Sequence, residues 1–101
     1  MDNKKSVKGI MLDRKDNVAI VTADTMPGDP VFYGQDENNY IVSRDEIRQY
    51  HKIALSDIEK GSFVIRYGEK IGVAIKNIKA GESVHVHNLK SESEARYEGI
   101  V

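Results

Sequence analysis

The sequence predicts a mainly β domain, and two observations predict it. Short apolar, β-branched runs alternate with turn signals rich in Gly, Asp and Asn, which is typical of a chain of short strands. One strand–turn–strand pattern also recurs, with an Asp or Asn in the turn, then a Gly, then a Val three residues later, at residues 18–31, 53–64 and 73–84. Since Gly accepts a positive φ and Asx side chains bond to turn backbone, we expect strands that bend through similar corners.

The apolar runs place the strands in order along the chain. We expect a flexible segment at 1–15 with a first strand from Gly9, and further strands at 18–21, 31–33, 40–42, 53–55, 62–67, 71–75 and after Gly81. Ser43 as an N-cap, with Glu46 three positions later, predicts one short helix near 44–50. The tail at 91–101 is charged, and we expect it to be either disordered or docked on a partner.

Composition indicates a single, ordinary soluble domain. Hydrophobic residues make up 40% and charged residues 31%, and the net charge of −1 argues against nucleic acid as a partner. The absence of Cys excludes disulfides, thiolate metal sites and Cys nucleophiles. No apolar run suits a signal peptide or a membrane helix, so we expect a cytoplasmic protein with no membrane contact. With three histidines and no Gly-rich phosphate loop, the chain has few residues from which to build a complete active site. We therefore expect any catalytic site to need another chain.

The segment 78–89 is where we expect the chemistry. It holds His85 and His87, which alternate with Val84 and Val86. A strand sends successive side chains to opposite faces, so both imidazoles would share one face. Two imidazoles so placed can share a metal ion or flank a substrate, and they equally suit the wet side of a half-buried strand. The spacing leaves both interpretations open.

Three motifs resemble a known family. They are His-Lys-x-Ala-Leu at 51–55, Tyr-Gly-x-x-Ile-Gly at 67–72 and His-x-His-Asn at 85–88. Together they resemble the N-terminal SAF domain, of β-clip fold, of the altronate/galactarate dehydratase family, which also includes the small subunit of sulfolactate sulfo-lyase. The resemblance implies a SAF-type β-clip over 16–90.

The chain departs from the family pattern in two places. Tyr50 precedes the His-Lys pair where the family usually has Gly, which leaves the geometry around His51 open. The family's single-chain enzymes continue into a large second domain that carries most of the catalytic residues, whereas this sequence continues into a short charged tail. We therefore expect the large part to be a separate subunit.

What the resemblance implies is a lyase component. It would be a small subunit or N-terminal domain of a sugar-acid dehydratase, a hydro-lyase that removes water from altronate- or galactarate-like substrates and uses a divalent metal, Fe²⁺. The implied catalytic residues are His51, His85 and His87, the implied substrate contacts are Lys52, Tyr67, Gly68 and Asn88, and the implied metal ligands are His85 and His87. The alternatives are a non-catalytic SAF binding or assembly module and the small subunit of a sulfolactate sulfo-lyase. A homo-oligomer is also left open.

Each of these residues also has a structural interpretation. His51 would end the short helix and Lys52 would be solvated. Gly68 would serve its turn and Tyr67 would pack, while Asn88 would cap a turn. Asp16 and Asn17 are expected mainly as turn formers.

Overall fold

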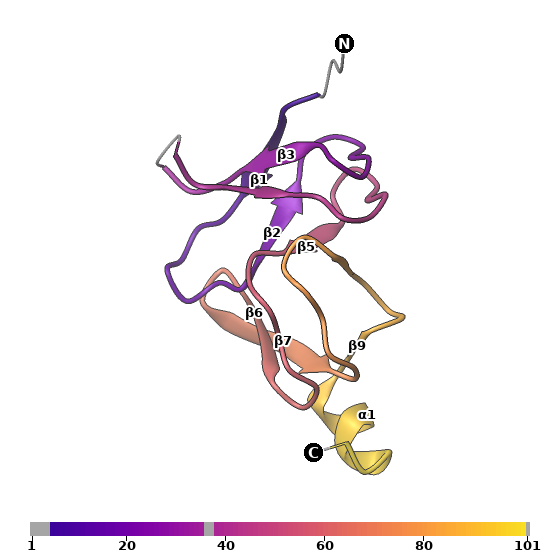
Figure 1. The fold of residues 1–101 in the computed structure, drawn as a ribbon. Helices are drawn as coiled ribbons and strands as arrows, with labels where there is room; N and C mark the ends of the chain where they lie inside the picture. The colour runs from indigo at the N-terminus through magenta and orange to yellow at the C-terminus, as the bar shows by residue number, and fades with distance from the viewer. Residues whose placement is uncertain (1–4, 36–37, 101) are drawn as a thin grey trace.

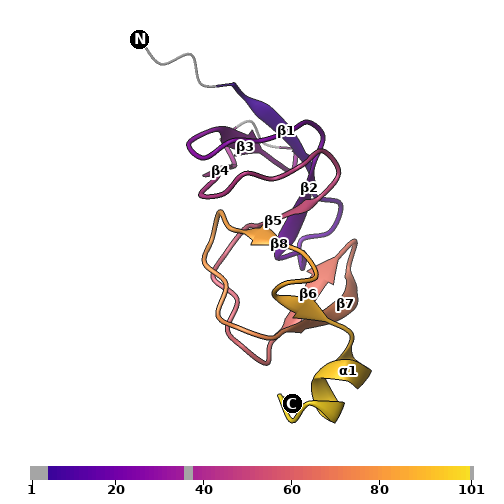
Figure 2. The same cartoon turned by 90° about the vertical axis from the view of Figure 1, so that its right-hand side faces the viewer.

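The computed structural model describes residues 5–35 and 38–100, and it confirms the mainly β fold (Figure 1). The strands are β1 (Val7–Ile10), β2 (Val18–Val21), β3 (Pro30–Phe32), β4 (Tyr40–Val42), β5 (Lys52–Ala54), β6 (Phe63–Arg66), β7 (Glu69–Ala74), β8 (Ser83–Val84) and β9 (Leu89–Lys90), and the helix is α1 (Glu92–Tyr97). Figure 2 shows the first four strands at one end of the molecule and α1 at the other, with β5 and β8 between them.

The strands form two sheets. The larger sheet has the order β4-β3-β1-β2-β5-β8, and the smaller one has the order β6-β7-β9. Neighbouring strands are antiparallel except β1 and β3, which run parallel. Because β8 is the last strand of the larger sheet, the residues that begin β5 and end β8 come together at its edge.

Two apolar clusters share the strands β2 and β5. The first contains Val7, Ala19, Val21, Val31, Ile47 and Ile53, and the second contains Val18, Ala54, Ile58, Val64, Ala74, Ile78 and Val84. Successive residues of a strand point to opposite faces, so Val18 and Ala19 enter different clusters, as do Ile53 and Ala54. These two strands are therefore the layer between the clusters, which explains why their apolar runs are continuous.

Four corners bend the strands, one more than the sequence pattern predicted. Isolated bridges pair Thr25 with Ile47 and Ile58 with Ile78. Three residues after each bridge residue the backbone takes a positive φ, at Gly28 (95°), Tyr50 (70°), Gly61 (90°) and Gly81 (92°). Three residues further on the side chain is fully buried, at Val31, Ile53, Val64 and Val84. The sequence pattern did not identify the additional corner, because Tyr50 stands where the other corners have Gly.

Tyr50 adopts the corner geometry that glycine adopts elsewhere. Its N–H donates to the carbonyl oxygen of Val21 at 2.7 Å, and the N–H of Val21 donates to the carbonyl oxygen of His51 at 2.9 Å. A left-handed backbone costs a residue with a Cβ about 1–2 kcal/mol, so these bonds hold a strained residue in place. The departure from the family pattern therefore leaves the corner before His51 unchanged in form.

The helix predicted near 44–50 is wrong. Ile47 is buried there and exchanges backbone hydrogen bonds with Thr25 at 2.7 and 2.8 Å, while the hydroxyl of Ser43 donates to the carbonyl oxygen of Asp45. The pairing with a distant segment overrides the local capping pattern. The described helix is instead α1, in the charged tail, where Ser91 caps the N-terminus by accepting from the N–H of Glu94.

Within the described ranges, no helix has the length and apolar character needed to cross a membrane.

Candidate functional site

His51 and His85 meet at the edge of the larger sheet. His51 directly precedes β5, and His85 directly follows β8. The two strands are antiparallel, with Lys52 opposite Val84, so the next pair in register brings the histidines together. Their rings stack with centroids 4.3 Å apart and planes 27° apart. The fold thus joins two of the three histidines predicted as site residues.

A tight turn separates His87 from this pair. β8 ends at Val84, and the carbonyl oxygen of His85 accepts hydrogen bonds from the N–H groups of Asn88 and Leu89 at 3.0 and 2.9 Å. Val86 at the tip is 74% exposed, and His87 is exposed beside it. The prediction that His85 and His87 share one face of a strand is therefore wrong, because the strand ends before either residue.

Asn88 closes this turn from inside. Its side-chain oxygen accepts from the N–H of His85 at 2.9 Å, and its amide nitrogen donates to the carbonyl oxygen of Ser83 at 2.8 Å. The residue is only 4% exposed. Asn88 thus positions the backbone of His85, which is the structural role that the sequence had left open for it.

Lys52 and Arg66 add two cations to the same region. Lys52 begins β5 and is half-buried, and burial lowers its pKa, with the positive charge of Arg66 lowering it further. Arg66 ends β6 and lies over the ring of Tyr67, with its guanidinium carbon 5.1 Å from the ring centroid. Its Nε atom is buried and has no hydrogen-bond partner. In the described part of the chain the ion pairs are Lys90–Glu98 and Arg96–Glu92, so neither site cation is paired with a carboxylate.

Neighbouring positive charges affect the pKa of His85. Its pKa lies below the ordinary value of 6.5, first because of desolvation and then because of the positive charges of His51, Lys52 and His87. A lowered pKa leaves the imidazole of His85 largely uncharged at pH 7. It is then able to accept a proton.

Tyr67 and Gly68 form the turn between β6 and β7. Both have positive φ, 56° and 77°, and the N–H of Gly68 donates to a carboxylate oxygen of Asp16 at 2.8 Å. The other oxygen of Asp16 accepts from the N–H groups of Leu12 and Asp13. Asp16 is therefore a turn former, as predicted, and it anchors the turn that carries Tyr67 against Arg66.

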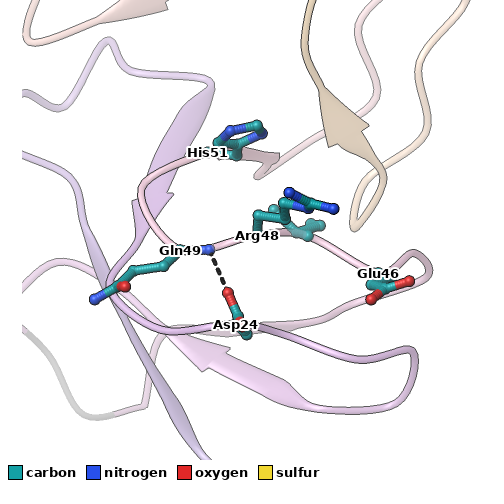
Figure 3. A pocket seen from close by; sticks show the side chains of 6 residues that line it. Asp24, Glu46, Arg48, Gln49 and His51 are labelled. Atoms are coloured by element: carbon teal, nitrogen blue, oxygen red, sulfur yellow. Dashed lines mark hydrogen bonds between the residues drawn. The ribbon is translucent and has the colours of Figure 1, made fainter.

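A pocket of about 400 Å³ is lined in part by His51 (Figure 3). Its lining residues are Asp24, Glu46, Ile47, Arg48, Gln49 and His51. The N–H of Gln49 donates to Asp24 at 2.8 Å within it. Of the histidine and cation cluster, this pocket includes His51 alone. The stacked histidines themselves lie where β8 forms the edge of the larger sheet.

The donor set does not fit a metal held by this chain alone. Across residues 5–35 and 38–100, no group of three or more His, Asp or Glu side chains is placed to hold a metal ion. His51 and His85 have their ring faces together, and the cationic Lys52 lies near them, which disfavours a second positive charge.

The bent strands and their four corners define the chain as a SAF-type β-clip domain. The sequence profile of the altronate/galactarate dehydratase SAF domain matches residues 7–92, and the chain belongs to that family.

Relatives of two sizes carry this domain. The chain is 40% identical over 82 residues to altronate dehydratase of Escherichia coli (strain K12), covering 81% of this chain and 16% of that protein. It is 36% identical over 83 residues to altronate dehydratase of Bacillus subtilis (strain 168), again covering 81% and 16%. It is 31% identical over 91 residues to the (2R)-sulfolactate sulfo-lyase subunit alpha of Chromohalobacter salexigens, covering 86% of this chain and 97% of that subunit. The chain thus spans about a sixth of the altronate dehydratases and nearly all of the sulfo-lyase subunit.

Sequence reasoning missed Arg66 as a member of this cluster. The residue directly precedes the Tyr-Gly motif, and the apolar pattern predicts it only as part of an extended strand. The signal available was a charged residue ending an otherwise apolar strand, next to two residues of a family motif.

Proposed function

We propose that this chain is the small subunit, or the N-terminal domain, of a cytoplasmic sugar-acid dehydratase. In this proposal a separate large subunit supplies most of the active site, and His51, His85 and Lys52 complete it. The observation that carries the proposal is the stacking of His51 on His85 at the edge of the larger sheet, near Lys52, which has no carboxylate partner among the described residues. The membership of the altronate/galactarate dehydratase family gives this edge its reaction class.

The proposed reaction suits these side chains. Removal of water from a sugar acid requires a base for the proton α to the carboxylate and an acid for the departing β-hydroxyl. A positive charge must also stabilise the negative charge that develops on the carboxylate. The uncharged imidazole of His85 suits the proton transfer, and Lys52 suits the charge stabilisation. His51, stacked on His85, lies close enough to contact the same substrate.

The divalent metal expected from the family, Fe²⁺, belongs to the large subunit in this proposal. The described residues of this chain make up no three-ligand set, which supports ligands that come mainly from the partner. We expect the isolated chain to retain no stoichiometric iron after dialysis and the complex to retain it. Metal analysis by inductively coupled plasma mass spectrometry measures both.

A second candidate is the small subunit of a sulfolactate sulfo-lyase. The observation that favours it is the match in size, since the chain aligns with 97% of the subunit alpha from Chromohalobacter salexigens. Both reactions remove the proton α to a carboxylate and expel the substituent on the β-carbon, so the same cluster of residues suits either reaction. The substrate then distinguishes them.

Reconstitution tests the proposal. The chain is co-purified with the product of a neighbouring large-subunit gene, and the complex is assayed with altronate, galactarate and (2R)-sulfolactate. We expect turnover of a sugar acid, reduced by about 100-fold or more in His85→Gln, as loss of a general acid or base typically does. Lys79→Gln, an exposed cation at another corner, is the matched control. A complex that forms but processes none of these acids, or a fully active His85→Gln complex, contradicts the proposal and favours a non-catalytic binding module.

A further inference from the structure

We infer that Lys52 and Arg66 form a clamp for the carboxylate of the substrate, in which Arg66 is a substrate-binding residue held in place by Tyr67. The inference rests on the proposed function in one respect, because the anion is taken to be the sugar acid. The family motifs leave Arg66 outside, and its assignment comes from the geometry of the cluster.

Arg66 has hydrogen-bonding capacity that the described residues leave unmet. Its Nε is buried without a partner, and no hydrogen bond among the described residues uses its guanidinium. A guanidinium presents several N–H donors in a rigid, planar fork that matches a carboxylate. A buried donor without a partner is costly, so its presence points to a ligand that satisfies it.

Lys52 and Arg66 carry like charges that act on each other. Arg66 lies close enough to Lys52 to lower its pKa, and both residues lack a carboxylate partner in the part of the chain that the structure describes. Glu69 pairs with Arg66 in the register of β6 and β7, yet it makes no ion pair with it. Two adjacent cations repel each other in the free chain. An anion bound between them converts this repulsion into attraction.

Arg66 is held in position before any ligand arrives. Tyr67 covers the guanidinium at 5.1 Å, and its own backbone is fixed at a φ of 56° by the adjoining turn. That turn is tied down by the hydrogen bond from Gly68 to the buried carboxylate of Asp16. A side chain fixed in this way loses little entropy on binding, which favours affinity. Tyr67 is thus a positioning residue that acts through Arg66.

The opposite face of the same hairpin provides a matched control. Lys70 pairs with Ile65, one position away from Arg66, so its side chain points to the other face. It also lies over an aromatic ring, with its Nζ 4.1 Å from the centroid of Phe63. Lys70→Gln therefore removes one charge and one cation–π contact without touching the clamp.

The first test uses the full chain and direct observation of the guanidinium. In ¹H–¹⁵N spectra of the arginine side chains, galactarate is expected to shift the Nε–Hε signal of Arg66 saturably, and the neutral polyol galactitol is expected to leave it in place. (2R)-Sulfolactate, which also carries a carboxylate, is expected to act like galactarate. A response to inorganic phosphate without a response to either carboxylate overturns the inference, as does a response to none of them.

The second test separates this inference from the proposed function. In the active complex, Arg66→Gln is expected to raise KM by about 10- to 100-fold, the size of a lost hydrogen bond to a charged group, with a smaller change in kcat. Lys70→Gln is expected to leave KM unchanged. An unchanged KM for Arg66→Gln overturns the clamp while dehydration itself stands. Binding of galactarate at Arg66 in a complex without lyase activity supports the clamp while the proposed reaction fails.

The thermal stability of the free chain provides a third readout. Arg66→Gln and Lys52→Met each remove one of two repelling cations, which reduces the charge repulsion in the free chain. We therefore expect both variants to have a Tm equal to or above that of the parent. A purely structural arginine would give the opposite result. A clear loss of Tm in both variants, together with unchanged carboxylate binding, overturns the inference.

Discussion

The imidazole of His51 stacks on that of His85 with ring centroids 4.3 Å apart, although the two residues flank different strands and belong to different sequence motifs. The contact depends on the antiparallel register of β5 and β8, in which Lys52 faces Val84. Because His51 directly precedes one strand of the pair and His85 directly follows the other, a single register places both rings and the neighbouring lysine. The candidate site is therefore a property of the sheet edge.

The pH response of His85 is the first prediction. Its pKa is lowered by desolvation and then by the charges of His51, Lys52 and His87, so its NMR titration midpoint is expected below 6.5. The unfolded chain then binds more protons than the folded chain between 6.5 and the lowered pKa. The free energy of unfolding is thus expected to fall as the pH drops through this window, and to lose this dependence above it.

Lys52→Met tests the cause of that shift. Removal of the lysine charge is expected to raise the titration midpoint of His85 toward 6.5, while Lys79→Met, at a distant corner, is expected to leave it in place. A midpoint at or above 6.5 in the parent chain would contradict the proximity of these charges.

Tyr50→Gly is expected to stabilise the fold. Tyr50 has a φ of 70° and is 67% exposed, so its replacement relieves backbone strain and removes little buried surface. The relief of about 1–2 kcal/mol exceeds the extra unfolded-state entropy of glycine, leaving a net gain of roughly 0.5–1 kcal/mol. Urea denaturation measures it. Arg48→Gly, at an exposed position of the same corner, serves as the control and is expected to destabilise.

Gly81→Ala is expected to be among the most damaging small substitutions in the chain. A Cβ at Gly81 would lie 2.5 Å from the carbonyl oxygen of Val42, in addition to the strain of a φ of 92°. Gly99 has a φ of 78° with nothing within 4 Å, so Gly99→Ala isolates the cost of the conformation. We expect about 1–2 kcal/mol for Gly99→Ala and at least about 1 kcal/mol more for Gly81→Ala. Equal losses in thermal denaturation would show that the close approach costs nothing.

Asn88→Ala is expected to release the turn that carries His85. It removes two hydrogen bonds from a residue that is 4% exposed, at a cost of about 1–3 kcal/mol. Asn77→Ala, which removes one hydrogen bond from an exposed residue, is expected to cost less. The carbon-13 shifts and ring contacts of His51 and His85 report whether the stack survives. A folded Asn88→Ala chain with an intact stack would contradict the positioning role.

Local pattern was a good guide to the corners and a poor guide to the ends of elements. Gly28, Gly61 and Gly81 marked three corners, because a positive φ restricts the residue type. The corner at Tyr50 was hidden, since a tyrosine held there by hydrogen bonds leaves no glycine signal. The capping box at Ser43 also gave a wrong prediction, because the backbone pairing of Ile47 with Thr25 determined the conformation of that segment.

By itself, the sequence determined the family, the mainly β class and the identity of His51, Lys52 and His85 as candidates. These follow from residue types and short spacings, which can be recognised in the sequence alone. Only the tertiary structure decided that His51 stacks on His85, that β8 ends before His87, and that the charge of Arg66 acts on Lys52. Those relations depend on strand register and on where a strand ends. Both are set by pairing between segments that are distant in the sequence, so no local pattern encodes them.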